Sequence, residues 1–407
     1  MFTRRFRQLA AALSMLALLA GGATAVPAAS AEHIIKIGAD LPLSGADATD
    51  GIPILNGIKL AVEQANHKAP SGYRFVVDAL DDTVAGLHSP QQGATNVQSL
   101  VADKAVLGMV GPFNSNVAAA EIPISNAAGL AMVNQSATNP DLTLSAKFRS
   151  SKPDLVTFFR VCATDNTQGE AGAQFYKAMG FNRVYIVDDN ETFGLGVAAV
   201  FERAFRQLGG TVLGHDHLTA QQQDFKSLLT KIAATHPDAI YFGGVTSTGG
   251  ALLRSQMAGA GLDPAKVAFL GTDGISDEAF IKTAGSAADN TYYTVAGPNP
   301  SELPAAKDFI KQYKATFHTD IGSYSANAYV ATQVLIAAVE EGIRQNHGAV
   351  PTRLQVVTNL QHTKSFPSII GTFSFTKTGD TTNPIISLWK IEHGKQVFVK
   401  QATVKAG

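Results

Sequence analysis

Short apolar runs alternate with amphipathic stretches along most of this chain, and this alternation is the feature that most restricts its fold. The runs have the length of buried strands, whereas the stretches carry apolar residues at helical spacing. In residues 54–66, for example, Leu55, Ile58 and Val62 fall on one stripe of a helix. Strands that alternate with helices of this length predict parallel sheets covered by helices on both faces.

The alternation occurs in two successive series. Strands of the first series are predicted at residues 34–38, 73–78, 105–110 and 129–133, with helices at 54–66, 91–102 and 117–128. Strands of the second series are predicted at residues 159–161, 184–188, 211–214, 239–242 and 267–271, with helices at 168–179, 194–208, 225–235 and 249–260. Two similar α/β series predict two lobes, and the crevice between lobes is a favoured place for a ligand.

The segment from Tyr292 onward is too short for a third series. Helices are predicted at residues 305–317 and 325–345, and strands at 371–375 and 385–391. We expect the helices to complete the first lobe and the strands the second, so that the chain crosses between lobes three times and forms a hinge. The predicted boundaries are 32–160 and 297–368 for lobe 1, and 161–296 and 369–407 for lobe 2.

The first 31 residues have the pattern of a secretory signal peptide. Arg4, Arg5 and Arg7 precede an apolar run at residues 9–20 that is too short for a permanent membrane helix. Small residues at 29–31 predict cleavage after Ala31, and residues 23–25 offer an earlier site. With no cysteine near either site, no lipid anchor is expected, and the predicted location is periplasmic or extracellular.

Composition excludes two classes of partner. Lys+Arg 32 against Asp+Glu 33 leaves a formal net charge of -1, so the chain lacks the positive charge that nucleic acid or an anionic membrane would attract.

Cys162 is the single cysteine, so no intramolecular disulfide can form. Between Val161 and Ala163, it is interpreted as a small core residue rather than a nucleophile.

Two loops with small hydroxyl residues follow predicted strands. Residues 111–116 and 134–140 lie at the carboxyl ends of these strands, where open α/β sheets bind ligands. A helix that starts there presents free backbone N–H groups, and Ser115, Ser136 and Thr138 add further donors. The two loops therefore predict a cradle for a small anion, most plausibly a carboxylate.

Signatures of catalysis or of a cofactor are missing from the sequence. It contains no Gly-x-Ser-x-Gly elbow, His-Glu-x-x-His helix or phosphate-binding loop. His215 and His217 lie two residues apart near a strand end, but the sequence offers no evident third ligand for a metal. We therefore expect no enzyme activity, no cofactor and no metal.

Several short motifs occur in order along the chain. Besides the two loops, they are residues 35–38, 42–45, 56–61, 81–82, 165–169, 241–244 and 271–274. Together they resemble the type I periplasmic binding proteins, and among them the branched-chain amino-acid-binding group (leucine/isoleucine/valine-binding proteins) that serves ABC importers. The resemblance covers nearly the whole chain after the signal peptide. It implies two Rossmann-like lobes joined by a three-crossing hinge, an amino acid bound between them, and ABC permease subunits as partners of a monomeric protein.

The resemblance also assigns ligand-binding residues. Ser115 and Thr138 match family positions that bind the ligand carboxylate, and Ser136 and Ala137 match positions that contribute backbone groups. Asp273 matches the acid that pairs with the α-ammonium. On the residues alone, Ser115 and Thr138 could instead be helix caps, and Asp273 a turn residue.

Three further positions depart from the family pattern. Asp50 and Val245 stand where the family often has aromatic residues, and Phe193 stands where it has Tyr. Loss of the rings predicts a roomier pocket. Asp50 either brings a charge to the pocket wall or is a solvated loop charge, and Phe193 belongs either to the wall or to the core.

We expect an exported solute receptor that closes on an amino acid and presents the closed form to a permease. Three alternatives stay open: a ligand sensor of the same fold that signals to a membrane receptor, a binder of an amide, urea-like or other small carboxylate solute, and a secreted hydrolase with an unfamiliar site.

Overall fold

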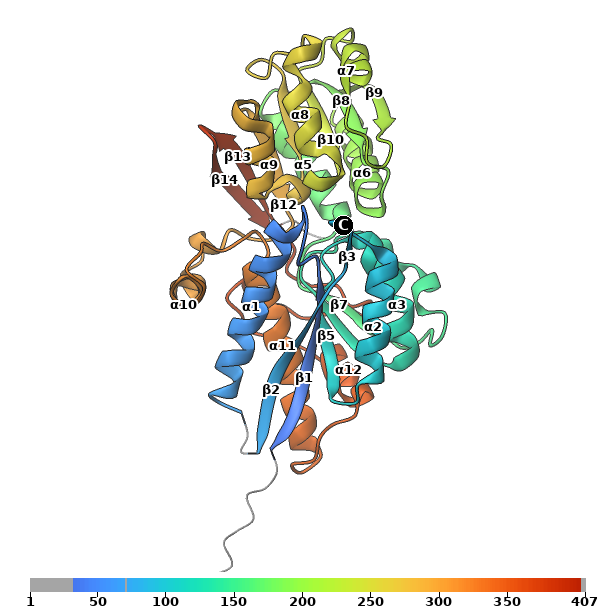
Figure 1. The fold of residues 1–407 in the computed structure, drawn as a ribbon, viewed down its shortest axis with the longest axis vertical. Helices are drawn as coiled ribbons and strands as arrows, with labels where there is room; N and C mark the ends of the chain where they lie inside the picture. The colour runs from blue at the N-terminus through green and yellow to red at the C-terminus, as the bar shows by residue number, and fades with distance from the viewer. Residues whose placement is uncertain (1–31, 70–71, 404–407) are drawn as a thin grey trace, which may run out of the picture.

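The computed structural model describes residues 32–69 and 72–403 and contains two α/β lobes stacked along the long axis (Figure 1). The predicted signal peptide lies outside the described residues. Each lobe is built around its own sheet, of five strands in the first lobe and seven in the second. Within the described ranges, no helix is both long and apolar enough to cross a membrane.

The first lobe has an entirely parallel sheet in the order β2-β1-β5-β6-β7. Its strands are β1 (His33–Leu41), β2 (Tyr73–Asp81), β5 (Val106–Val110), β6 (Ala131–Asn134) and β7 (Phe158–Arg160). Its helices are α1 (Ala48–Asn66), α2 (Pro90–Ala102), α3 (Ser115–Ala128), α4 (Asp141–Leu144), α10 (Lys307–Phe317), α11 (Ser325–Gln345) and α12 (Arg353–Gln361). α1 packs against α11, and α2 against α3 on the opposite face of the sheet (Figure 1). A small hairpin, β3 (Thr83–Val84) with β4 (Leu87–His88), follows β2.

The second lobe has the strand order β14-β13-β12-β11-β10-β8-β9. Five of these strands are parallel: β8 (Arg183–Asp188), β9 (Thr211–His217), β10 (Ala239–Gly243), β11 (Ala268–Gly271) and β12 (Thr291–Val295). The antiparallel hairpin of β13 (Ile385–Glu392) and β14 (Lys395–Thr403) extends the sheet beyond β12. The helices of this lobe are α5 (Asp165–Ala178), α6 (Thr192–Gln207), α7 (Lys226–Ala233), α8 (Ala251–Gln256) and α9 (Glu278–Ala284).

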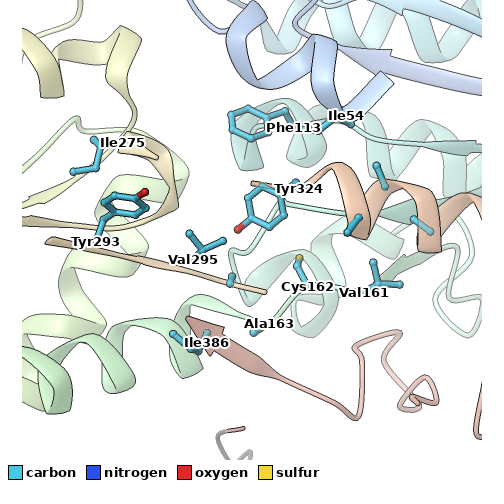
Figure 2. Packing of buried hydrophobic residues seen from close by; sticks show 14 of the residues in the cluster. Ile54, Phe113, Val161, Cys162, Ala163, Ile275, Tyr293, Val295, Tyr324 and Ile386 are labelled. Carbon is cyan, nitrogen blue, oxygen red and sulfur yellow. The ribbon is translucent and has the colours of Figure 1, made fainter. Parts of the chain in front are cut away.

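Three chain crossings lie together between the lobes. The backbone N–H of Ala163 donates to the carbonyl of Ala296 (3.2 Å), and Ser387 Oγ donates to the carbonyl of Gly297 (2.8 Å). Figure 2 shows apolar side chains from these crossings packed near Tyr324: Val161, Cys162, Ala163, Val295 and Ile386. Cys162 is a buried free thiol, as predicted, and burial raises its pKa to about 12.

The segment before β13 differs from its prediction. The predicted strand at 371–375 is wrong, because these residues form only isolated bridges, including Phe375 with Thr381. The Phe375 ring packs on Phe159 with centroids 5.1 Å apart, and Arg160 Nε donates to Asp380 Oδ1 at 2.6 Å. Because these contacts join the segment to β7, we propose that the third crossing lies at about residues 382–385 and that lobe 1 extends past the predicted boundary at 368.

Helix α1 begins at Ala48, six residues before its predicted start. The carbonyl of Asp47 accepts the N–H groups of Asp50 and Gly51, both at 3.0 Å. Gly51 allows the close approach, because a Cβ there would lie 2.0 Å from the carbonyl oxygen of Pro42. Asp50, placed in a loop by the sequence prediction, therefore lies in the first turn of this helix.

Buried carboxyl groups gather beneath the carboxyl end of the first sheet. Asp40, Asp82 and Glu121 are each fully buried, and Asn96 donates to Asp40 Oδ1 at 2.7 Å. Among the described residues, neither oxygen of Asp82 or of Glu121 has a hydrogen-bond partner. Burial raises the pKa of Asp82 to about 8 and that of Asp40 to about 6, and burial also raises the pKa of Glu121.

This group makes stability depend on pH. A carboxyl whose pKa is higher in the folded state holds its proton there while the unfolded chain has released it, so the free energy of unfolding should fall as pH rises from about 4 to about 8. Asp82→Asn mimics the protonated acid. We expect it to raise the free energy of unfolding by about 2–4 kcal/mol at pH 8 and to have little effect at pH 4.

Urea denaturation at both pH values measures this difference, with the exposed Glu63→Gln as a control that should change neither value. A variant less stable than wild type at pH 8 would contradict the prediction.

Candidate functional site

A small cavity lies where the carboxyl ends of the two sheets face each other. Its cavity volume is only ≈ 20 Å³, room for about one water molecule and far below the roughly 300–1,000 Å³ typical of pockets for drug-sized molecules. Its walls come from loops after β5, β6, β10 and β11 and from the start of α6. The lining residues are Phe113, Asn114, Ser115, Ser136, Phe193, Val245, Asp273 and Gly274.

The wall from the first lobe presents hydrogen-bond donors. Asn114 is the N-cap of α3 and Ser115 its first residue, so the free N–H groups of the first turn are at the cavity. In the second loop, Asn134 Oδ1 accepts the N–H groups of Ser136 (2.8 Å) and Ala137 (2.6 Å). Ser136 Oγ donates to the carbonyl of Phe113 at 3.1 Å. The two loops are thus bound to each other.

Ala137 and Thr138 lie behind this wall. Neither lines the cavity, although both are completely buried. The carbonyl of Ala137 accepts from Arg160 Nη1 at 3.0 Å, and that of Thr138 accepts the N–H of Asp165 at 3.0 Å. The roles that the resemblance gives these two residues stay predictions, and their backbone contacts position the loop in this structure.

The wall from the second lobe is acidic. Asp273 begins the short 3-10 helix after β11, and Gln168 donates a hydrogen bond to it. Burial raises the pKa of Asp273 to about 6 and that of Asp165, in the first turn of α5, to about 8. Gly274 permits the tight turn, because a Cβ there would lie 2.2 Å from the carbonyl oxygen of Gly244. Asp165 does not line the cavity, so a cation entering it would offset the buried charge of Asp273.

Phe193 and Val245 supply the apolar part of the wall. Phe193 was placed in a loop by the sequence prediction but is the second residue of α6. It packs with Val197 and Val245 in a small cluster of buried residues. The ring is almost buried and also lines the cavity, and its part in ligand binding stays a prediction.

Asp50 lies outside the cavity lining but is not a freely solvated charge. It is half-buried in the first turn of α1. Burial, followed by the charges of Asp277, Asp47 and Asp273, raises its pKa well above the usual value. The prediction that it belongs to a loop is wrong, and the structure leaves its part in ligand binding as a prediction.

A charged bridge joins the two lobes beside the cavity. His88, from β4, contacts Asp47 Oδ2 through Nδ1 (2.7 Å) and Glu191 Oε2 of the second lobe through Nε2 (2.9 Å). Asn116 Nδ2 also donates to Glu191 Oε2, at 3.0 Å. Although burial opposes the charged imidazolium, the hydrogen bonds to Asp47 and Glu191 raise the pKa of His88 to about 10. A bridge whose imidazole is charged at neutral pH therefore connects the two lobes.

Sequence reasoning found part of this arrangement. The cavity is also lined by Phe113, Asn114 and Gly274. These residues belong to the loops that contain the predicted site residues, so the loop positions could have predicted them. The bridge was missed, because His88 and Glu191 lie 103 positions apart and no local pattern connects them.

The bridge should bias the lobes toward closure. Glu191→Gln removes the charge but keeps the size of the side chain, and because Glu191 is partly exposed we expect a loss of only about 1 kcal/mol from the closed state. Small-angle scattering of the ligand-free protein should show a larger radius of gyration for this variant.

The exposed Glu302→Gln, far from the bridge in the sequence, is the control for a change of charge alone. Equal radii for wild type and Glu191→Gln would show that the bridge does not hold the lobes together.

Comparison with known proteins agrees with this architecture. The sequence matches the family described as periplasmic binding protein over residues 34–394. Leu/Ile/Val-binding protein homolog 3 of Brucella melitensis is 31% identical over 389 residues, which are 95% of this chain and 99% of that protein. Leu/Ile/Val-binding protein BraC3 of Rhizobium johnstonii is 32% identical over 391 residues, which are 94% of this chain and 98% of that protein.

A solved structure supports the same assignment. The leucine-binding protein LivK of Thermotoga maritima has a TM-score of 0.79 to this structure at 25% identity, with 91% of this chain and 99% of that chain covered. The predicted two-lobed α/β fold is confirmed. By sequence and by fold, this chain belongs to the periplasmic binding protein family.

Proposed function

We propose that this chain is the exported solute-binding component of an ABC importer and that it closes on an amino acid of the branched-chain type or a related one. The observation that carries the proposal is the pairing of opposite chemistries across one cavity. The donors of α3 with Ser115 lie on one wall and the buried Asp273 on the other. The names of the Leu/Ile/Val-binding relatives support the same class of ligand.

An α-amino acid complements both walls at once. Its carboxylate suits the positive end of the α3 dipole and the Ser115 hydroxyl. Its ammonium suits Asp273, which is buried and has a raised pKa because its negative charge lacks sufficient compensation. Pairing with the ammonium would return the carboxylate to its ionised form. Since the walls belong to different lobes, only the closed form makes both sets of contacts.

Closure would then serve recognition by a permease. Contacts that exist only when the lobes meet shift the population toward the closed state. The Asp47–His88–Glu191 bridge would also stabilise the closed form. It lies outside the cavity lining and does not need the ligand. A membrane partner that distinguishes closed from open lobes would therefore respond to loaded protein.

The alternatives differ in what each requires of the site. A small carboxylate without an ammonium would leave Asp273 unpaired, so the raised pKa of Asp273 favours an amino acid over such a solute. A sensor would use the same site and differ only in the membrane partner, which reconstitution with a permease and its ATPase distinguishes. A hydrolase would turn over the bound ligand.

Calorimetric titration with leucine, phenylalanine, glutamine and arginine tests the ligand class. We expect at least one of them to bind, and Asp273→Asn to lose about 2–5 kcal/mol of its binding free energy, because the ammonium loses its charged partner. Wild-type affinity should fall about fivefold between pH 6 and pH 5, because binding must then displace the proton of Asp273.

Asp263→Asn changes an exposed carboxylate elsewhere in the second lobe and should bind normally. If no amino acid binds at millimolar concentration, the proposed ligand class is wrong. Unchanged affinity of Asp273→Asn would remove this residue from the site.

Asp50 should influence selectivity among amino acids. Burial and the neighbouring acids Asp277 and Asp273 raise its pKa, so a ligand side chain that carries a positive charge or a donor would favour the ionised form of Asp50, which leucine cannot do. We expect Asp50→Ala to weaken glutamine or arginine relative to leucine in competition calorimetry. Thr49→Ala, an exposed residue in the same helical turn, is the matched control. Tight binding restricted to leucine, isoleucine and valine, and unaffected by Asp50→Ala, would contradict this role.

A further inference from the structure

Parallel pairing of β8 and β9 brings a carboxylate to the two histidines that the sequence left without a third partner. His215 and His217 are two residues apart on β9, so their side chains leave the same face of the strand. Asp188 ends β8 directly opposite His217 in the register. The ends of β8 and β9 lie in the second lobe, with β9 as the edge strand (Figure 1).

The three side chains converge on one point. Asp188 Oδ2 lies 2.7 Å from His215 Nε2 and 2.8 Å from His217 Nδ1. One donor atom from each residue lies within 4.8 Å of the other two, and the imidazole rings are 5.2 Å apart. Asp188 is fully buried and fixed by the N–H of Asn190 (2.8 Å), whereas His217 is about half exposed. The group is thus rigid on one side and open to solvent on the other.

A second carboxylate orients one of the rings. Glu202 Oε2, from α6, lies 2.8 Å from His215 Nδ1, and Arg206 holds the other oxygen of Glu202 at 2.8 Å. In this structure Nδ1 of His215 contacts Glu202 and Nε2 contacts Asp188, so loss of the proton between Nε2 and Asp188 would free this nitrogen to bind a metal. Carboxylate partners of this kind are the usual outer shell of histidines that bind metals.

We propose that Asp188, His215 and His217 form a binding site for a divalent late transition metal, with Zn²⁺ as the expected ion. Two imidazole nitrogens and one carboxylate oxygen are a donor set that suits Zn²⁺ rather than Mg²⁺ or Ca²⁺. The exposed side of His217 leaves a fourth position for water. The site is outside the cavity between the lobes, and its existence does not depend on the proposed amino-acid ligand.

Zinc titration of the chain without a histidine tag tests this site, after treatment with EDTA and dialysis. Isothermal calorimetry with ZnCl₂ should show one saturable site per chain, and Co²⁺ should give visible absorption bands of a low-coordinate complex. His215→Ala and His217→Ala should each abolish both signals. Glu202→Gln keeps all three ligands but loses the orienting carboxylate, so it should weaken zinc binding by about 10- to 100-fold.

The matched control is His67→Ala, which removes an exposed histidine from the end of α1. It should leave zinc binding unchanged. Far-UV circular dichroism verifies that each variant is folded, and His217→Gln, at a half-exposed position, replaces the alanine variant if that one is not. Absence of a saturable site, or zinc binding that persists in folded variants of both His215 and His217, would overturn the proposal and identify the group as a hydrogen-bonded ionic cluster.

Discussion

Parallel strand pairing is the constraint on which the rest of this structure depends. Each parallel strand must be followed by a return connection across a face of the sheet, so the loops at the carboxyl ends are free to carry function. In this chain the three crossings turn the carboxyl ends of both sheets toward each other. The loops after β5, β6, β10 and β11 therefore meet in one cavity, although 160 positions of sequence separate Phe113 from Asp273 (273 − 113).

Several carboxyl groups are buried in this structure, and the groups that surround each of them decide whether it is protonated, paired with a cation or hydrogen-bonded to histidine. Asp40, Asp82 and Glu121 form a closed acidic group in the first lobe, where protonation is the simplest way to avoid a buried negative charge. Asp273 has the same tendency but lies at a cavity, so a cation can replace the proton. At Asp188 the partners are imidazoles, and the pKa of that carboxyl stays low despite burial because His215 and His217 hydrogen-bond to it.

The sequence predicted the parts of the fold that local patterns determine. Most strands and helices of both series lie within a few residues of their predicted positions, and α11 matches its prediction at both ends. Errors arose where tertiary contacts override local signals. The helix predicted at residues 54–66 begins at Ala48 instead, because the carbonyl of Asp47 accepts its first N–H groups and Gly51 fits against Pro42. Residues 371–375 have the composition of a strand, yet Phe375 packs on Phe159 instead of joining a sheet.

The same distinction applies to the sites. Ser115, Ser136 and Asp273 could be predicted because each follows a strand and matches a family pattern, and the structure brings all three to one cavity. The partners of His88 and the third member of the histidine group on β9 could not, because register and lobe closure decide them. The sequence shows His215 and His217 as a pair two residues apart. The pairing of β8 with β9 places Asp188 beside them.

Opening and closing must remain balanced for such a receptor to respond to its ligand. A ligand shifts the equilibrium only by its difference in affinity for the two states, so a bridge that closed the empty lobes completely would leave the ligand nothing to change. His88 and Asp47 are buried, but Glu191 is about one-third exposed, which weakens the ionic contact between His88 and Glu191 that crosses the cleft. The bridge can therefore assist closure while the buried Asp273, still lacking a cation, opposes it in the empty protein. Under the proposed function, the ligand ammonium would offset the buried charge of Asp273 in the closed form, and the bridge would add to the stability of that form.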